Sequence, residues 1–374
     1  RQMEKGLNYF REKFGCRPRT AINVDSFGHD RGLVQLLRKS GYTSYLVGRP
    51  SLEVCKAPGP DFLWEGYDGT CIPVHLAAEG YNSGLGKVRR KLEYYRRQEG
   101  TDNSVLALWG IGNHGGGPSK EDLDEISLLQ KEWEKEGVQL IHSTPEMYFD
   151  SISGSELPLF DREIGPSMPG CYTSQVRIKQ THCLLENMLY QTEKLLAAAE
   201  IFTGMEGDWE SLKQAEEILL FNEFHDILPG TSVQRAEDAA LREMGGAISL
   251  LEKEKTRAFM HLCRQTEKLE PGVIPIFACN PHPWPVKAVL ECEFQLQDQG
   301  WDYTYTDFEV RYQGEVIPSQ LEKEGSSIPL DWRKRLVFMA DIPPFATAAL
   351  YAYPKVLTGK PELPQTIESE IRLE

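Results

Sequence analysis

The sequence predicts a multidomain protein in which an α/β domain, an all-α domain and an all-β domain follow one another along 374 residues. Strand-like and helix-like patterns alternate over residues 1–160, which indicates a parallel sheet with crossover helices. Three amphipathic stripes in residues 161–268 predict a three-helix bundle. Short β-type runs separated by turn residues fill residues 269–374 and predict an incomplete β-sandwich.

One apolar run is central to the α/β prediction. Residues 105–109 (VLALW) are typical of a strand buried on both faces. Ser119 with Asp122 three residues later resembles a capping box and predicts the start of a helix, and Gly137 is well placed to end it. The remaining predicted elements are strands at 19–24, 45–47 and 138–141 and helices at 2–14, 30–40 and 87–97. Strands and helices in this order fit a partial (β/α) barrel-like domain whose first strand is missing.

The two later domains are predicted from the positions of proline and glycine residues and from the spacing of apolar residues. Proline and glycine residues between 158 and 170 indicate a linker. The helical stripes consist of Leu184, Leu185, Met188, Leu189, Leu195 and Leu196, then Trp209, Leu212, Ile218 and Leu219, then Ala239, Leu241, Ile248 and Leu251. After Pro271, strands are expected at 273–277, 286–294, 308–312 and 336–340.

Composition excludes several classes of protein. The net charge of −15 argues against a nucleic-acid-binding surface, which normally carries a basic stripe. No window approaches 18 consecutive apolar residues, so no transmembrane helix and no membrane partner are expected. The eight cysteines are dispersed without a CxxC pair, which favours free thiols in a cytoplasmic protein. The sequence begins at Arg1 inside a predicted helix, so we expect further sequence upstream.

The first motif, Asn23-Val-Asp25-Ser-Phe-Gly28-His29-Asp30, lies where a predicted strand ends. In α/β folds, catalytic groups sit at the carboxyl ends of strands, so Asp25 is placed to face a cleft. The alternative is that Asp25 or Asp30 only caps the following helix.

The second motif is the glycine-rich segment 110–118 (GIGNHGGGP), which follows the apolar run and opens a helix. Its glycines allow the backbone to approach a ligand closely. The Gly-Lys-Ser/Thr of a phosphate-binding P-loop is absent. We therefore favour a sugar-approach loop in which Asn113 and His114 face hydroxyl groups.

The third motif, residues 222–231 (NEFHDILPGT), ends the second apolar helix stripe. A histidine on such a helix is more often structural than a ligand. The adjacent His225-Asp226 pair before a Pro-Gly turn favours a functional role, because the pair projects from a helix terminus. Imidazole and carboxylate together suit Zn²⁺, with Asp226 orienting a sugar hydroxyl or supporting the metal ligands.

These three segments, in this order, resemble glycoside hydrolase family 38, the α-mannosidases. The resemblance extends over nearly the whole chain and includes the segments 171–175 (CYTSQ) and 279–285 (CNPHPWP). It implies a retaining, zinc-dependent α-mannosidase that forms a covalent glycosyl-aspartate intermediate. By the same resemblance, Asp25 is the nucleophile and a zinc ligand and His225 is a second ligand. Substrate contacts are implied for Arg49, Asp226 and Tyr81.

The sequence departs from the family at two points. A His-x-Asp pair that supplies two further zinc ligands is missing, because no histidine precedes Asp25. With one zinc expected per full-length subunit and only two ligands here, this chain alone is expected to bind the metal poorly and to lack activity. The family's usual acid/base aspartate is replaced by Asn113-His114. His114 is the hypothetical acid/base, because imidazole titrates near neutrality.

The sequence thus predicts an enzyme that hydrolyses α-mannosides of oligosaccharides in the cytoplasm of a bacterium. One alternative is a catalytically impaired carbohydrate-binding relative, which Asn113 favours slightly. Another is a metal-dependent hydrolase such as a deacetylase. Homo-oligomerisation, linkage preference and the physiological substrate are left open.

Overall fold

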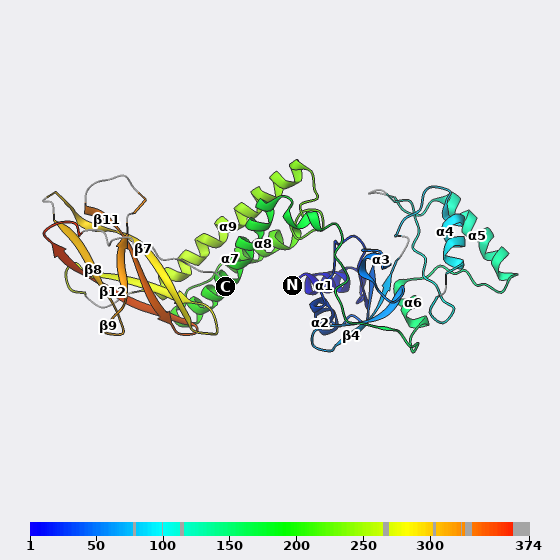
Figure 1. The fold of residues 1–374 in the computed structure, drawn as a ribbon, viewed down its shortest axis with the longest axis horizontal. Helices are drawn as coiled ribbons and strands as arrows, with labels where there is room; N and C mark the ends of the chain where they lie inside the picture. The colour runs from blue at the N-terminus through cyan, green and yellow to red at the C-terminus, as the bar shows by residue number, and fades with distance from the viewer. Residues whose placement is uncertain are drawn as a thin grey trace, which may run out of the picture. The chain divides into compact units, whose positions relative to one another are not determined.

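The computed structural model describes the chain except residues 78–79, 99, 113–115, 265–268, 302–303, 323, 326–330 and 362–374. Its contacts divide the chain into two compact units (Figure 1). Unit 1 comprises Arg1–Lys179 and Asn222–Ala240, and unit 2 comprises Gln180–Phe221 and Leu241–Glu374. Unit 1 therefore consists of two stretches of chain. The predicted division at residues 160 and 268 stays a prediction.

Unit 1 contains a five-stranded sheet in the order β1-β2-β4-β3-β5. Its strands are β1 (Thr20–Asn23), β2 (Ser44–Val47), β3 (Asp61–Glu65), β4 (Cys71–Leu76) and β5 (Leu159–Phe160). Three pairs are parallel, but β3 and β4 form an antiparallel hairpin that the expected strand–helix alternation did not include. The described strands form an open sheet, and a barrel-like closure stays a prediction.

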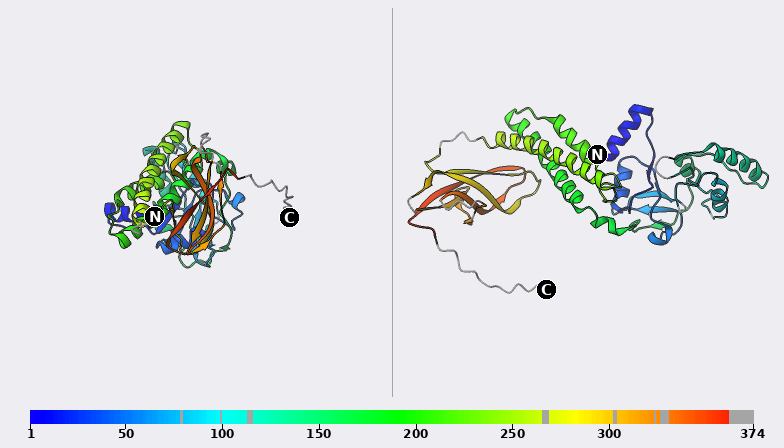
Figure 2. Two further views of the ribbon diagram at one scale, coloured as in Figure 1. Left: turned by 90° about the vertical axis from the view of Figure 1, so that its left-hand side faces the viewer. Right: turned by 90° about the horizontal axis from the view of Figure 1, so that it is seen from above.

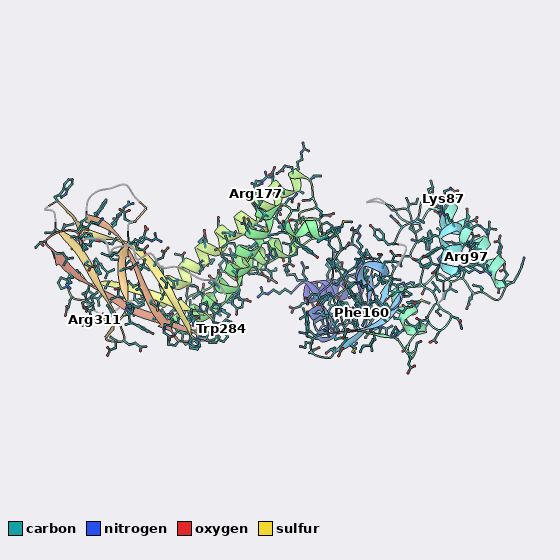
Figure 3. All side chains as sticks on the ribbon, in the orientation of Figure 1. Lys87, Arg97, Phe160, Arg177, Trp284 and Arg311 are labelled. Atoms are coloured by element: carbon teal, nitrogen blue, oxygen red, sulfur yellow. The ribbon has the colours of Figure 1, made fainter. Side chains whose placement is uncertain are left out.

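The helices of unit 1 lie between and after these strands. They are α1 (Gln2–Phe14), α2 (Gly32–Lys39), α3 (Leu52–Cys55), α4 (Val88–Arg96), α5 (Lys120–Glu134), α6 (Pro145–Ser151) and the 3₁₀ helix η1 (Pro169–Thr173). Val34 and Leu37 of α2 join a core with alternate residues of β2, β3 and β4. Phe160, labelled in Figure 3, packs in the same core, with its ring centroid 5.2 Å from that of Phe62.

One buried carboxylate joins α4 and α5. Ser119 caps α5 as predicted, because its Oγ accepts a hydrogen bond from the Asp122 amide. The Asp122 carboxylate accepts hydrogen bonds from the Ser119 hydroxyl and from the Val88 amide at the start of α4. Val88, Leu92 and Tyr95 form the buried side of α4, and this helix confirms the one predicted at 87–97.

Two predicted strands are wrong. Residues 105–109 and 138–141 belong to none of the described strands. Their apolar side chains do alternate as in a strand. Leu106 and Leu108 pack with α6, whereas Ala107 and Trp109 pack with α4 and α5. The alternating pattern of residues 106–109 therefore arises because the segment packs between two hydrophobic cores, and not because it is hydrogen bonded to a neighbouring strand.

Unit 2 begins with long helices (green in Figure 2). The helices α7 (Val176–Thr203) and α9 (Gln234–Leu262) each start in unit 1 and continue in unit 2, and α8 (Trp209–Phe221) lies wholly in unit 2. Leu185 and Leu196 are fully buried, but Leu184 is 51% exposed and does not belong to the predicted stripe. A closed three-helix bundle stays a prediction.

The rest of unit 2 is formed by two antiparallel sheets, with strand orders β10-β11-β7 and β6-β12-β8-β9. Leu336 and Phe338 of the first sheet share one hydrophobic core with Val310 and Leu350 of the second, which is the layered arrangement of a sandwich. The strands are β6 (Ile274–Asn280), β7 (Val286–Gly300), β8 (Tyr305–Tyr312), β9 (Glu315–Val316), β10 (Ser319–Glu322), β11 (Asp331–Ile342) and β12 (Ala346–Leu357).

Among the helices of the described ranges, none combines the length and the hydrophobicity that a membrane span requires.

Candidate active site

The candidate site begins at the carboxyl ends of β1 and β2. These strands are parallel neighbours, so Asp25 and Arg49, each two residues beyond its strand, emerge at the same edge of the sheet. Arg49 Nη2 lies 2.6 Å from Asp25 Oδ1. Asp25 does not cap the next helix, whereas Asp30 does contact its start, accepting a hydrogen bond from the Gly32 amide. The capping alternative therefore does not apply to Asp25, and its position in a cleft stays a prediction.

His225 lies on the other side of the same carboxylate. Its Nε2 is 3.1 Å from Asp25 Oδ2 and 3.6 Å from Asp226 Oδ2. The Asp25 side chain is 26% exposed and that of His225 is 28% exposed, so both remain accessible to a ligand. Three of the motif residues expected from the sequence, with Arg49, are thus brought together within unit 1.

The turn that carries His225 is held by the segment 171–175. Ser174 donates a hydrogen bond to the carbonyl of Gly230, and the Gln175 side-chain amide donates one to the Ser232 carbonyl. Gly230 has φ +76°, and a Cβ there would lie 2.7 Å from the Ser174 carbonyl oxygen. Thr231 Oγ1 donates a hydrogen bond to Asp226 Oδ1 at 2.6 Å. These contacts fix the orientation of the His225-Asp226 pair.

The loop that carries Asp25 is fixed by residues that follow the sheet. The Phe27 carbonyl accepts hydrogen bonds from the Tyr172 hydroxyl and from the Ser167 amide. His29 and Ile164 exchange both backbone hydrogen bonds. The Arg49 guanidinium lies over the Phe27 ring, 5.7 Å from its centroid. This loop is consequently held from several directions while Asp25 faces Arg49 and His225.

His29 was not among the predicted site residues. It is 6% exposed, and its ring lies between the Arg49 carbonyl oxygen, 2.9 Å from Nε2, and the Tyr45 hydroxyl, 2.7 Å from Nδ1. Burial lowers the pKa of His29 to about 4, so the ring is neutral near pH 7. The available signal was its place in the Asp25 motif, but the sequence alone does not reveal its partners.

A cavity of 560 Å³ opens beside His225. Its lining includes Asn23, Phe27, Tyr172 and Glu223. This volume falls within the range of small-molecule sites, and aromatic rings beside polar groups are typical of their walls.

The other predicted site residues are not part of this cluster. Tyr81 lies in the loop after β4 with its side chain 42% exposed, and none of its described contacts reaches Asp25. Asn113 and His114 lie outside the described residues. The described part of the glycine-rich loop consists of its two ends. They are joined by a backbone hydrogen bond, which the Ile111 amide donates to the Gly117 carbonyl.

A second polar cluster is buried elsewhere in the sheet. Asp61 of β3 is hydrogen bonded to His75 Nδ1 at 2.8 Å and accepts hydrogen bonds from the hydroxyls of Tyr148 and Thr101. Burial by itself raises the pKa of Asp61, but these bonds outweigh it and hold the pKa below its usual value. His75 is 3% exposed, and its Nε2 has no partner within the described part of the chain.

Two protein-family models match consecutive segments of the chain. Residues 1–166 match the family described as "Glycosyl hydrolases family 38 N-terminal domain". Residues 168–262 match the "Alpha mannosidase middle domain". The chain belongs to glycoside hydrolase family 38. The family 38 assignment confirms the resemblance inferred from the three motifs and agrees with the mixed α and β architecture.

Relatives of this family 38 chain include α-mannosidase G of Dictyostelium discoideum, with 30% identity over 63% of the chain and 22% of the relative. Human α-mannosidase 2C1 is 27% identical over 76% of the chain and 27% of its own length. The chain thus spans about a quarter of these curated relatives. An α-mannosidase structure from Enterococcus faecalis V583 has the same fold, with a TM-score of 0.72 at 16% identity, covering 96% of this chain and 47% of that one.

Proposed function

We propose that the protein containing this chain is a retaining α-mannosidase in which Asp25 is the nucleophile. The observation that carries the proposal is the position of the Asp25 carboxylate between the Arg49 guanidinium at 2.6 Å and the His225 imidazole at 3.1 Å. A carboxylate fixed by a cation and an imidazole at the carboxyl edge of a parallel sheet suits attack on an anomeric carbon. Membership of family 38 supports the choice of α-mannosides.

In the proposed reaction, an Asp25 oxygen forms a bond to the anomeric carbon while the bond to the leaving oxygen breaks. A second group, about 5–5.5 Å from Asp25, gives its proton to the leaving oxygen. His114 is our hypothesis for this group. Water, deprotonated by the same group, then releases the sugar from Asp25 with retained configuration. Arg49 orients the carboxylate, and Asp226, held by Thr231, is placed to accept a hydrogen bond from a sugar hydroxyl.

Asp25 and His225 would also hold the zinc ion that the family resemblance implies. Two donors of one tetrahedral zinc lie about 3.3 Å apart, and the donor atoms here are 3.1 Å apart. Asp25 Oδ1 faces the Arg49 guanidinium, so Oδ2 is the oxygen that would reach a metal beside His225. In those same residues no group of three or more His, Cys, Asp or Glu suits a metal, so these two side chains would be part of a larger set. A bound zinc would supply a positive charge that polarises and orients sugar hydroxyls.

The decisive experiment is covalent trapping with the full-length protein. An activated fluorinated mannoside whose adduct hydrolyses slowly should label the peptide that contains Asp25, detected by mass spectrometry. Asp25→Asn should abolish labelling, and Asp30→Asn is the matched control that keeps it. A mannosyl adduct on another carboxylate would overturn the nucleophile assignment. Mannoside binding without turnover would support a carbohydrate-binding relative, and hydrolysis of acetyl groups without an adduct would support a deacetylase.

Zinc dependence needs its own measurement. We expect about one zinc per full-length subunit, and His225→Ala should lower both zinc content and hydrolysis of an aryl α-mannoside. His142, which is exposed, provides the control histidine for the same substitution. Wild-type protein that turns over without zinc after chelation would exclude the metal. Cytoplasmic location also stays a proposal, supported by the eight free cysteines.

A further inference from the structure

A chain of hydrogen bonds leads from the core of unit 1 to the Asp25–Arg49 pair. The Tyr45 ring is 1% exposed and stacks on Trp64, with 6.0 Å between the ring centroids and 10° between the planes. The Tyr45 hydroxyl lies 2.7 Å from His29 Nδ1, and His29 Nε2 lies 2.9 Å from the carbonyl oxygen of Arg49. The side chain of that arginine contacts Asp25.

The chemistry of the two partners fixes the tautomer of His29. A main-chain carbonyl oxygen accepts hydrogen bonds and cannot donate them, so Nε2 must carry the proton. Nδ1 is then the acceptor for the Tyr45 hydroxyl. Because burial keeps the ring neutral, both nitrogens are satisfied without a net charge next to Arg49. The backbone of His29 is fixed as well, since it exchanges two hydrogen bonds with Ile164.

We infer that His29 is a positioning residue that fixes the main chain at Arg49, and through it the direction in which Asp25 faces the substrate. This inference rests on the proposed function of Asp25. The described contacts of His29 are with Arg49, Tyr45 and Ile164 and not with Asp25, so its effect on Asp25 passes through Arg49. The residue before Arg49 contributes no side chain, because Gly48 packs against the backbone of Val24, the residue that follows β1. The imidazole–carbonyl bond is consequently a specific polar restraint on Arg49 from the side of the core.

A positioning role differs from a merely structural one in what it changes. Loss of the Nε2–H donor should let Arg49 leave Asp25, and displacement of reacting groups by about 1 Å can cost up to about 100-fold in rate. The loss should appear in kcat more than in KM. It should persist for aryl mannosides with activated leaving groups, because attack by Asp25 is needed whatever the leaving group.

The test uses three variants of the full-length protein. His29→Leu removes both hydrogen bonds, and His29→Gln restores a donor near the position of Nε2. Tyr45→Phe removes the partner of Nδ1, together with the contact of that hydroxyl with the Asn23 side chain, and leaves the Nε2 bond in place. Ser44→Ala is the matched control. The Ser44 hydroxyl forms a buried hydrogen bond of 2.7 Å with Thr20, which joins β1 to β2 at the end of the strands away from Asp25. Kinetics are normalised to folded enzyme, and crystal structures give the Arg49–Asp25 distance.

We expect kcat to fall roughly 10- to 100-fold in His29→Leu and to recover to within about threefold in His29→Gln. Tyr45→Phe should lie between them, and Ser44→Ala should lose stability but keep its kcat. In crystals of His29→Leu, the guanidinium should move beyond the ~4 Å of an ion pair. An unchanged kcat per folded enzyme, or an unmoved Arg49 in His29→Leu, would overturn the inference. An inactive wild type would instead contradict the proposed function, while the crystal structures would still decide the role of His29.

Discussion

Gly48 lies so close to Val24 that a methyl group at residue 48 would be 2.3 Å from the Val24 carbonyl oxygen. The two residues precede Arg49 and Asp25, so the contact brings together the ends of the strands that carry the candidate site. A glycine is required here by close approach of two backbones and not by its φ angle.

Gly48→Ala should therefore separate Asp25 from Arg49. Overpacking of this kind costs roughly 1–3 kcal/mol of stability, and we expect kcat/KM to fall by about 100-fold or more. Gly59→Ala is a suitable control, because its nearest atom would lie 4.0 Å away. Thermal unfolding and aryl α-mannoside kinetics measure the two effects. Equal kcat/KM in both variants would contradict the proposed importance of this contact.

Gly230→Ala should disturb His225. The substitution combines an unfavourable φ of +76° with a clash against Ser174, so we expect a loss of about 1–3 kcal/mol together with lower zinc content and activity. Gly204→Ala places alanine at φ +70° in open space and isolates the backbone strain. If both variants retain zinc equally, the Ser174–Gly230 contact does not position the histidine.

His29 makes stability depend on pH in a defined window. Its pKa falls from 6.5 in the unfolded chain to about 4 in the folded protein, so the unfolded state binds more protons between these values. The contribution of His29 to the free energy of unfolding is fully present above pH 6.5. It should decline by up to about 3 kcal/mol as the pH falls to 4. Denaturant titrations at several pH values give the slope. The slope should be smaller in His29→Gln, and an identical slope would exclude His29 as its source.

Asp61→Ala should be strongly destabilising, because it leaves the hydroxyls of Tyr148 and Thr101 and the His75 ring without their buried partner. We expect a loss of about 3 kcal/mol or more. Because hydrogen bonds lower the pKa of Asp61, the wild-type contribution is present at neutral pH and is lost as the pH falls through the folded pKa.

Asp68→Ala is the comparison for Asp61, since it removes a carboxylate with a lowered pKa that is exposed to solvent. The free energies of unfolding of both variants are measured at pH 7. A loss in Asp61→Ala no larger than that in Asp68→Ala would show that the buried cluster contributes little.

Local patterns predicted the elements better than their connections. The amphipathic pattern of 87–97 and the Ser119 cap led to the correct helices. The apolar run 105–109 did not lead to a strand. An apolar run indicates that the segment is buried, but a β-strand also needs a neighbouring strand to which its backbone is hydrogen bonded. The β3–β4 hairpin was missed because strand–helix alternation alone does not specify which strands pair.

The same limit applies to the candidate site. Residue types and a family resemblance singled out Asp25, Arg49, His225 and Asp226, and the structure brings these four together. Their distances depend on the contacts of Gly48 and Gly230, whose necessity is visible only once backbones meet in space. His29 was overlooked because its significance lies in its two hydrogen-bond partners and not in its residue type.

Unit 1 is completed by a stretch of chain that arrives late. Asp25 belongs to Arg1–Lys179, whereas His225 belongs to Asn222–Ala240, and residues 180–221 between them are part of unit 2. During synthesis, the Asp25 loop therefore exists before its imidazole partner has been made. Contacts between residues so distant in sequence form slowly. The chain loses conformational entropy when a long loop closes, and the stabilising contact forms only after that loss. The nascent chain should accordingly gain its sheet well before it gains a competent active centre.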